Sequence, residues 1–231
     1  MKKLVVLTGA GMSAESGLST FRSSDGLWEN HRVEDVATPE GWERDPEAVL
    51  DFYNMLRRKL ITANPNEGHC GLATLEREYE VRIITQNVDN LHERAGSGHV
   101  LHLHGELMKS RSSGDENLIY DIPVNNPDIK IGDKCAKGYQ LRPHIVWFGE
   151  AVPMIEKAID WVAEADIFVV IGTSLNVYPA AGLLHYVRRG VPVYLIDPNE
   201  VHAPGNITRV IRKGATEGVK ELTALLKQSH S

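Results

Sequence analysis

The feature that most restricts the fold is a series of short apolar runs separated by segments with helical periodicity. The runs are continuously apolar rather than alternating, which is typical of strands buried on both faces of a parallel sheet. Strands that alternate with helices in this way predict an open α/β sheet. The expected strands are "KLVVLTG", "EVRIITQN", "HVLHLHG", "DIFVVIGTS", "VPVYLID" and "TRVIRKG". The expected helices are Pro46 to Thr62, Asn66 to Tyr79, Ile155 to Ala165, Pro179 to Arg189 and Ala215 to Lys227.

Two stretches, 22–65 and 110–141, interrupt this alternation. The second is rich in Ser, Asp, Asn, Lys and Gly and has no strong period. The predicted fold class is therefore α/β, a Rossmann-like parallel sheet with helices on both faces plus a smaller inserted module. We expect one catalytic unit over 1–231, because no internal repeat divides the chain. Its core would comprise approximately 1–21, 66–109 and 142–231, with the interrupting stretches as the small module.

Composition and charge narrow the range of partners. The 25 basic and 31 acidic residues give a net charge of -6, which argues against binding to nucleic acid. Cys70 and Cys135 make no disulfide framework and favour a reducing compartment. The sequence shows neither a signal-peptide pattern nor an apolar run of the roughly 20 residues that a membrane span needs. We expect a cytoplasmic protein that binds neither nucleic acid nor membrane.

The first apolar run leads directly into a glycine loop, "GAGMSA". The loop satisfies G-x-G-x-x-G/A, and such a loop after a strand indicates backbone N–H groups that cradle a pyrophosphate. In an oxidoreductase a second strand would follow and end in an acidic residue for the ribose. Here "ESGLSTFRSSDGLW" follows instead, which disfavours hydride transfer. The polar segments "TQNVDNLH", "HGE" and "GTSLNVYP" follow three other strands and should meet at the same edge of the sheet.

Five segments in this order resemble the sirtuin family of NAD-dependent protein deacylases: "GAGMSAESG" with "FR", "TQNVDNLHERAG", "LHGEL", "RPHIVWFGE" and "GTSLNVYPAA". The resemblance runs from Leu7 to about Ala215 and so covers most of the chain. "GLW" and Tyr53 in "FYN" resemble the bacterial members grouped with the class III, desuccinylase-type sirtuins. The resemblance implies that NAD is a co-substrate. An acyl-lysine protein or peptide would be converted to free lysine, with nicotinamide and O-acyl-ADP-ribose as the other products.

The resemblance assigns catalytic roles to residues after the second and third strands. His104 would act as general base on a ribose hydroxyl, a role that suits a side chain titrating near neutral pH. Gln86 and Asn87 would hold the nicotinamide ribose, and Asp89 would bind the nicotinamide carboxamide. Taken alone, these residues could equally be a strand-end histidine and turn caps. His102 shares a face with His104, and without two further ligands we expect it in the core or at its rim rather than on a metal.

The other cofactor-binding residues implied by the resemblance are spread over the chain. Phe21 and Arg22 would belong to a loop that closes over NAD and excludes water. Asp197 stands where many relatives have asparagine; its carboxylate can accept two ribose hydroxyls but would repel a phosphate, which favours NAD over NADP. The expected set is Gly9, Ala10, Gly11, Ala14, Glu15, Thr20, Phe21, Arg22, Trp28, Gln86, Asn87, Asp89, Gly172, Thr173, Ser174, Asp197 and Ala215.

The chain departs from the family where two C-x-x-C pairs usually bind a structural zinc. The matching places read "SSGD" from Ser112 and "CAKG" from Cys135, so one cysteine of four is present. Because tetrahedral zinc needs four ligands, we predict no zinc and no other metal. The small module would then be held by packing, with "LIYDIPV" from Leu118 as its apolar strand.

The acyl group that the enzyme prefers is a second point of departure. In the desuccinylase class an arginine follows the tyrosine by three residues, but here Leu56 takes that place and Arg57 comes next. A leucine cannot offset the desolvation of a carboxylate as a bidentate arginine does, so acetyl or apolar acyl groups should be favoured over succinyl. Trp147 could equally belong to the core. The expected substrate-lining residues are Tyr53, Leu56, Arg57, Val146 and Phe148, beside a groove where the peptide adds as a strand.

Other function classes share parts of the pattern. A mono-ADP-ribosyltransferase would break the same bond of NAD, and a sensor module would bind NAD without turnover. An NAD-dependent oxidoreductase is disfavoured by the missing second strand. His104 together with Asn87 and Asp89 favours a catalytic protein over a sensor.

Overall fold

The structure is a computed structural model that describes residues 1–18, 27–203 and 207–228. A parallel sheet, together with the helices that cover it, forms its larger part. Within these ranges six parallel strands lie in the order β11-β10-β9-β1-β4-β5. Their bounds are β1 Lys3–Thr8, β4 Glu80–Thr85, β5 Val100–His102, β9 Ile167–Ile171, β10 Val193–Ile196 and β11 Arg209–Ile211. The chain builds outward from β1 in both directions, so the order reverses between β1 and β9. In open α/β sheets a ligand crevice lies at such a reversal, beyond the carboxyl ends of the strands.

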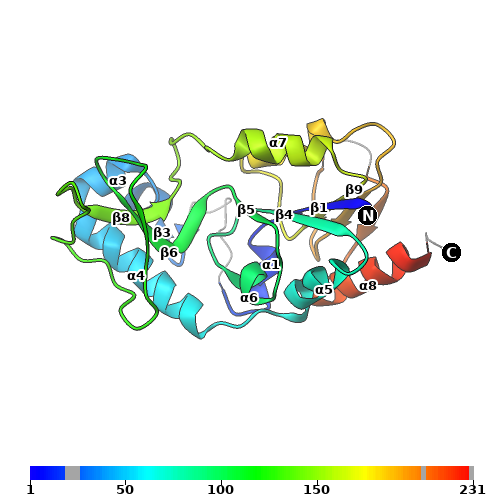
Figure 1. The fold of residues 1–231 in the computed structure, drawn as a ribbon, viewed down its shortest axis with the longest axis horizontal. Coiled ribbons are helices and arrows are strands. Elements are labelled where there is room, and N and C mark those ends of the chain that lie inside the picture. Colours follow the sequence, from blue (N-terminus) through cyan, green and yellow to red (C-terminus); the bar gives the residue numbers. More distant parts are fainter. Residues whose placement is uncertain (19–26, 204–206, 229–231) are drawn as a thin grey trace.

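Helices cover both faces of this sheet, as Figure 1 shows with α7 on one side and α5 and α8 on the other. Successive residues of β1 enter different cores: Leu4 packs on the α5 and α8 side, and Val5 packs on the α7 side. The Rossmann-like fold class is therefore confirmed. The helices of this part are α1 Gly11–Ala14, α5 Glu67–Leu75, α6 Leu91–Arg94, α7 Ile155–Ala163 and α8 Ala215–Gln228.

The helix expected at Pro179 to Arg189 is the element that differs most from its prediction. It forms a 3₁₀ helix, η1, over Ala180–Tyr186. Gly182 lies within it, and a glycine in a helix interior lowers the stability of an α-helix. Tertiary packing therefore decides whether this segment forms an α-helix or a 3₁₀ helix. Leu183 and Leu184 are buried in the core beside α7.

A smaller module lies beside the sheet, at the left of Figure 1. Its antiparallel sheet has the order β7-β6-β8 and includes a strand within the expected "LIYDIPV" run. Strands β6 and β8 pair with each other, so this sheet extends past the boundaries expected at 109 and 142. The elements are β2 Leu27–Trp28, β3 His31–Arg32, α2 Val33–Val36, α3 Pro39–Arg44, α4 Pro46–Thr62, β6 Gly105–Ser112, β7 Ile119–Asp121 and β8 Leu141–Ile145.

Two polar side chains of α4 attach a loop of the small module to this helix. Asn54 donates through Nδ2 to the Ile129 carbonyl and accepts from the Ile129 N–H, both at 2.9 Å. Arg57 is fully buried and donates to the carbonyls of Leu107 and Pro127, both at 2.7 Å. Burial lowers the pKa of Arg57 to about 10. The Asn54 and Arg57 side chains therefore supply hydrogen bonds that these backbone groups would otherwise form with water.

Candidate active site

The glycine loop lies at the expected crevice, directly against the end of β9. Gly9 donates to the Ile171 carbonyl at 2.9 Å, and Gly11 donates to the Gly172 carbonyl at 2.8 Å. A Cβ atom on Gly11 would lie 2.7 Å from the Gly172 Cα. The backbones of the two loops can approach this closely only because both positions lack side chains. The structure thus brings together the glycines that the sequence predicted from separate motifs.

Asn87 and Asp89, both predicted, are linked to this loop through Ser13. Asn87 Nδ2 donates to the Gly9 carbonyl at 3.0 Å and to Ser13 Oγ at 3.2 Å. Ser13 Oγ in turn donates to Asp89 Oδ2 at 2.8 Å, and the Leu91 N–H binds Oδ1. Burial raises the pKa of Asp89, while the hydrogen bonds from Leu91 and Ser13 act in the opposite direction. Sequence reasoning missed Ser13, although its place inside the glycine loop was a usable signal.

His104 stands beside these residues with its tautomer determined by one hydrogen bond. Nδ1 lies 3.0 Å from the Gln86 carbonyl, which can only accept, so Nδ1 carries the proton. Nε2 is then the basic nitrogen, and no described residue binds it. Burial lowers the pKa of His104, and the bond to Gln86 opposes this shift. The Gln86 side chain donates to Thr173 Oγ1 at 3.1 Å, which connects the segment to the end of β9.

Two residues predicted to bind the adenosine lie directly after β10 and at the start of α8. Asp197 is buried, and its Oδ1 accepts from the Asn199 N–H at 2.8 Å. Ala215 is buried at the first position of α8. Glu15 Oε1 accepts from the Thr216 N–H at 3.3 Å, so this predicted residue connects the glycine loop to α8.

Several predicted cofactor residues lie elsewhere or are more exposed. Trp28 packs edge-on against Phe52 and Tyr53 of α4, with ring centroids 5.3 and 6.0 Å away. Ala14 and Ser174 are exposed, whereas Ala10 is half-buried. Thr20, Phe21 and Arg22 lie outside the described residues.

The predicted substrate residues on α4 face the protein interior. Tyr53 is fully buried, and its hydroxyl accepts from Trp147 Nε1 at 3.0 Å. Burial raises the pKa of Tyr53. Leu56 packs in the same apolar cluster, together with Trp147, which is a core residue as its alternative interpretation held. Arg57 uses Nε and Nη1 to bind the carbonyls of Leu107 and Pro127, whereas its Nη2 is buried without a hydrogen-bond partner among the described residues.

The predicted substrate residues Val146 and Phe148 follow β8 and lie closer to His104 than the predicted residues on α4 do. The Val146 N–H donates to the His104 carbonyl at 2.9 Å, and the Val146 side chain is half-buried. Phe148 donates its N–H to the Ala37 carbonyl at 2.9 Å and leaves 44% of the residue exposed. This segment therefore joins His104 to the small module and presents apolar surface between them.

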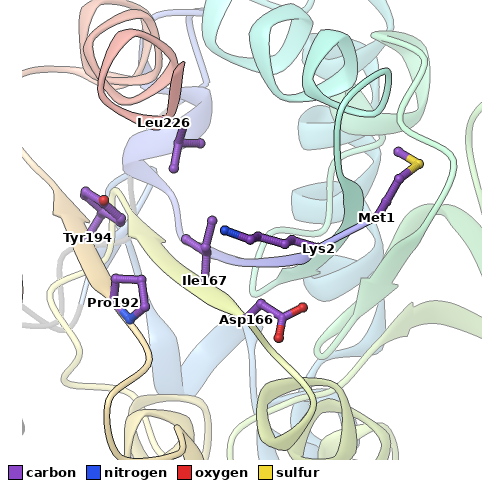
Figure 2. Close-up of a pocket in the computed structure, with 7 residues that line it drawn as sticks. All are labelled: Met1, Lys2, Asp166, Ile167, Pro192, Tyr194 and Leu226. Carbon is purple, nitrogen blue, oxygen red and sulfur yellow. The ribbon is translucent and has the colours of Figure 1, made fainter. Parts of the chain in front are cut away.

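A hollow of about 620 Å³ lies at the opposite edge of the sheet. Figure 2 shows that residues at the amino ends of strands line it, among them Lys2, Asp166 and Pro192. Ligands of open α/β sheets bind at the carboxyl ends, where the glycine loop and His104 lie, so this hollow is not the nucleotide site. Within the described ranges, no helix is long and apolar enough to cross a membrane.

The fold and the site together define a class of protein. It is an α/β nucleotide-binding protein with a histidine at the crevice whose Nε2 is unprotonated. The Sir2 family model matches residues 9–179. The chain is 62% identical over 231 residues to an NAD-dependent protein deacylase of Bacteroides thetaiotaomicron, covering 98% of each chain. It is 51% identical over 224 residues to one of Helicobacter pylori strain 26695, covering 96% of each. The chain therefore belongs to the Sir2 family, and the resemblance to sirtuins inferred from its motifs is confirmed at the level of the family.

Solved structures agree with this assignment. A Sir2 homologue in complex with NAD is 42% identical with a TM-score of 0.89, covering 100% of this chain and 91% of the other. A complex of Sir2 with a p53 peptide and NAD is 31% identical with a TM-score of 0.80, covering 97% and 93%.

Proposed function

We propose how this chain carries out NAD-dependent protein deacylation, the activity of its family. The observation that carries the proposal is the state of His104, whose Nδ1 proton is held by the Gln86 carbonyl while Nε2 remains basic. This base lies at the same crevice as the glycine loop, Asn87 and Asp89. A neutral imidazole with one nitrogen available is the form that accepts a proton.

The residues of the crevice fit NAD. The glycine loop follows β1 and leads into α1, which is the position in which such loops bind a pyrophosphate. Asp89 and Ser13 would bind the nicotinamide carboxamide, and Gln86 and Asn87 would hold the adjoining ribose. When bound, NAD supplies the glycosidic bond whose cleavage releases nicotinamide. His104 would remove a proton from a ribose hydroxyl, which would take over the acyl group, and a water molecule would be consumed in releasing the free lysine and O-acyl-ADP-ribose.

The acyl group is proposed to be acetyl or an apolar chain rather than succinyl. Leu56 occupies the position where the desuccinylase-type members have arginine, and Arg57 is fully buried against backbone carbonyls. Tyr53 is bound to Trp147. A succinyl carboxylate would thus lose its hydration without gaining a cationic partner. The resemblance to the desuccinylase class would then lie in sequence rather than in acyl preference.

A peptide panel tests both the activity and the acyl preference. Purified protein with NAD is incubated with matched acetyl-, succinyl- and decanoyl-lysine peptides, and nicotinamide and free-lysine peptide are measured together. We expect equal amounts of the two products, with succinyl slower by about tenfold or more because an unpaired carboxylate is desolvated. A succinyl peptide that is the fastest substrate would overturn the preference. Label from NAD retained on the peptide would indicate an ADP-ribosyltransferase, and NAD binding without turnover would indicate a sensor.

Asp197 is proposed to select NAD over NADP. Its carboxylate is 7% exposed, and one of its oxygens holds the Asn199 N–H. A phosphate on the adenosine ribose would be repelled by the negative charge of this buried carboxylate. Calorimetric titration should show NADP binding at least about tenfold more weakly than NAD, and Asp197→Asn should narrow the difference. Equal affinities in the unaltered protein would contradict the proposal.

The small module is proposed to hold no structural zinc. Ser112 Oγ accepts from the N–H groups of Gly114 and Asp115 at 3.2 and 3.1 Å. The Asp115 carboxylate binds the Lys137 ammonium at 2.6 Å, which places a cation among the residues that match the zinc ligands. Cys135 is the one thiol there. This donor set does not fit tetrahedral zinc.

Asn54 is expected to contribute to the stability of the small module, which zinc stabilises in relatives. Asn54→Ala should lower the free energy of unfolding by about 1–3 kcal/mol, because the buried Ile129 N–H and carbonyl lose their partner. A chelator should leave the melting temperature unchanged. Urea unfolding measures the first and a thermal melt the second, with Asn125→Ala on the same loop, at an exposed position, as the control. Stoichiometric zinc in purified protein would contradict the proposal.

A further inference from the structure

His102 lies between two hydrogen-bond acceptors. Its Nδ1 is 3.1 Å from the Asn87 carbonyl oxygen, and its Nε2 is 2.7 Å from Glu93 Oε1. A carbonyl oxygen can only accept hydrogen bonds, and the same is true of an ionised carboxylate. A neutral imidazole has one N–H and could satisfy only one of them. With Glu93 ionised, both acceptors are satisfied only by a ring that carries protons on both nitrogens.

We propose that His102 is a positioning residue: a charged imidazolium, held by Glu93, that fixes the Asn87 backbone so that the Asn87 side chain is set for NAD. The consequence for NAD rests on the proposed function, whereas the charge of the ring does not. His102 was expected to be a core or rim residue. In the described part of the chain, no group of three or more metal-ligating side chains includes it.

The charges around His102 favour this state. Burial disfavours the cation, but the hydrogen bond and charge of Glu93, with Glu106 on β6, raise the pKa of His102 above its ordinary 6.5. Partial burial raises the pKa of Glu93, but His102 outweighs it, so this pKa lies below its usual value. The His102 charge also acts to lower the pKa of Asp89. The contribution of the pair to stability is lost as the pH rises through the raised pKa of His102, and it is lost again as the pH falls through the lowered pKa of Glu93.

The other charged and titratable neighbours do not reverse this conclusion. Lys109 on β6 is neutralised by Glu106 at 2.8 Å. His92 on α6 is buried, and burial, His69 and His102 hold its pKa well below 6.5, so it stays uncharged. The Glu93 side chain is 39% exposed, so solvent screens its charge in part. The hydrogen bond of 2.7 Å, rather than long-range attraction, is then the main support of the cation.

The contrast with His104 makes the assignment specific. Both rings hold consecutive carbonyls, His104 that of Gln86 and His102 that of Asn87. His104 makes one such bond, and its pKa is lowered by burial. His102 makes a second hydrogen bond, to the Glu93 carboxylate, and its pKa is raised. The two histidines therefore divide the work, one as a neutral base and the other as a charged support.

The protonation state can be measured directly in the full chain without ligands. Heteronuclear NMR of the imidazole nitrogens at neutral pH should show His102 protonated on both nitrogens and His104 on Nδ1 alone. His102→Gln assigns the signals. A His102 ring with one proton at neutral pH would overturn the proposal, whether or not the protein deacylates peptides.

NAD titration by calorimetry over a pH series tests the positioning role. We expect unaltered protein to bind NAD more weakly as the pH rises through the His102 pKa. His102→Gln should bind about tenfold more weakly at neutral pH and lose this dependence, as expected for one charge-assisted hydrogen bond. Glu93→Gln, at a partly exposed position, should move the dependence to lower pH without unfolding the protein.

His99→Gln, on the same segment and exposed, should bind like the unaltered protein. NAD affinity in His102→Gln equal to that of this control, with the pH dependence retained, would contradict the positioning role. Because no acyl peptide enters either experiment, failure of deacylation would count against the proposed function alone.

Discussion

Replacing His104 with alanine is expected to lower acyl-dependent nicotinamide release by about 10²- to 10⁴-fold, the usual contribution of a general base. The imidazole Nε2 is the group that would take the ribose proton, and alanine supplies no substitute. NAD affinity should change little, because His104 contacts the Gln86 backbone rather than the glycine loop. Single-turnover assays with an acetyl-lysine peptide measure the first effect, and calorimetry measures the second.

The pH profile of unaltered protein is the control for this interpretation. Because burial lowers the pKa of His104, the neutral ring persists below pH 6.5, and turnover should fall only as the pH drops through the lowered value. This acidic limb should be absent from the residual rate of His104→Ala. A variant with most of its activity, or with the same acidic limb, would show that another group is the base.

Gly172→Ala is expected to abolish NAD binding and to lower the free energy of unfolding by roughly 3 kcal/mol or more, since overpacking and a left-handed backbone both oppose it. A Cβ there would lie 2.4 Å from the Met12 nitrogen and 2.5 Å from the Gly11 carbonyl carbon. These are backbone atoms of the nucleotide loop, which cannot turn aside as a side chain can. Urea unfolding and NAD titration measure the two effects.

Gly190→Ala separates the steric effect from the conformational one. Gly190 has a φ of +88°, but among the described residues no atom outside its immediate chain neighbours lies within 4 Å of its Cβ position. In this variant the free energy of unfolding should fall only by the cost of placing alanine in the left-handed conformation, about 1–2 kcal/mol. NAD binding should be normal. Equal losses in the two variants would show that the contact with the glycine loop is not the cause.

Local sequence was enough for much of the fold and for the centre of the site. Buried parallel strands need continuous apolar runs, so β1, β4, β9 and β10 were recognisable from single segments. Glycines and polar residues directly after these strands must meet at one edge, which placed Gly9, Asn87 and Asp89 together. The order of the motifs then identified the family.

Contacts between distant segments decided the rest. No local pattern shows that Ser13 connects Asn87 to Asp89, or that Arg57 faces the carbonyls of residues 107 and 127. The same holds for His102, whose charge follows from an acceptor on each side. The sequence alone determined which strands form and that the polar segments after them meet at one edge of the sheet, because both follow from patterns along the chain. Only the tertiary structure decided the partner, and hence the protonation and role, of each polar side chain, because a hydrogen bond depends on atoms that the fold brings together.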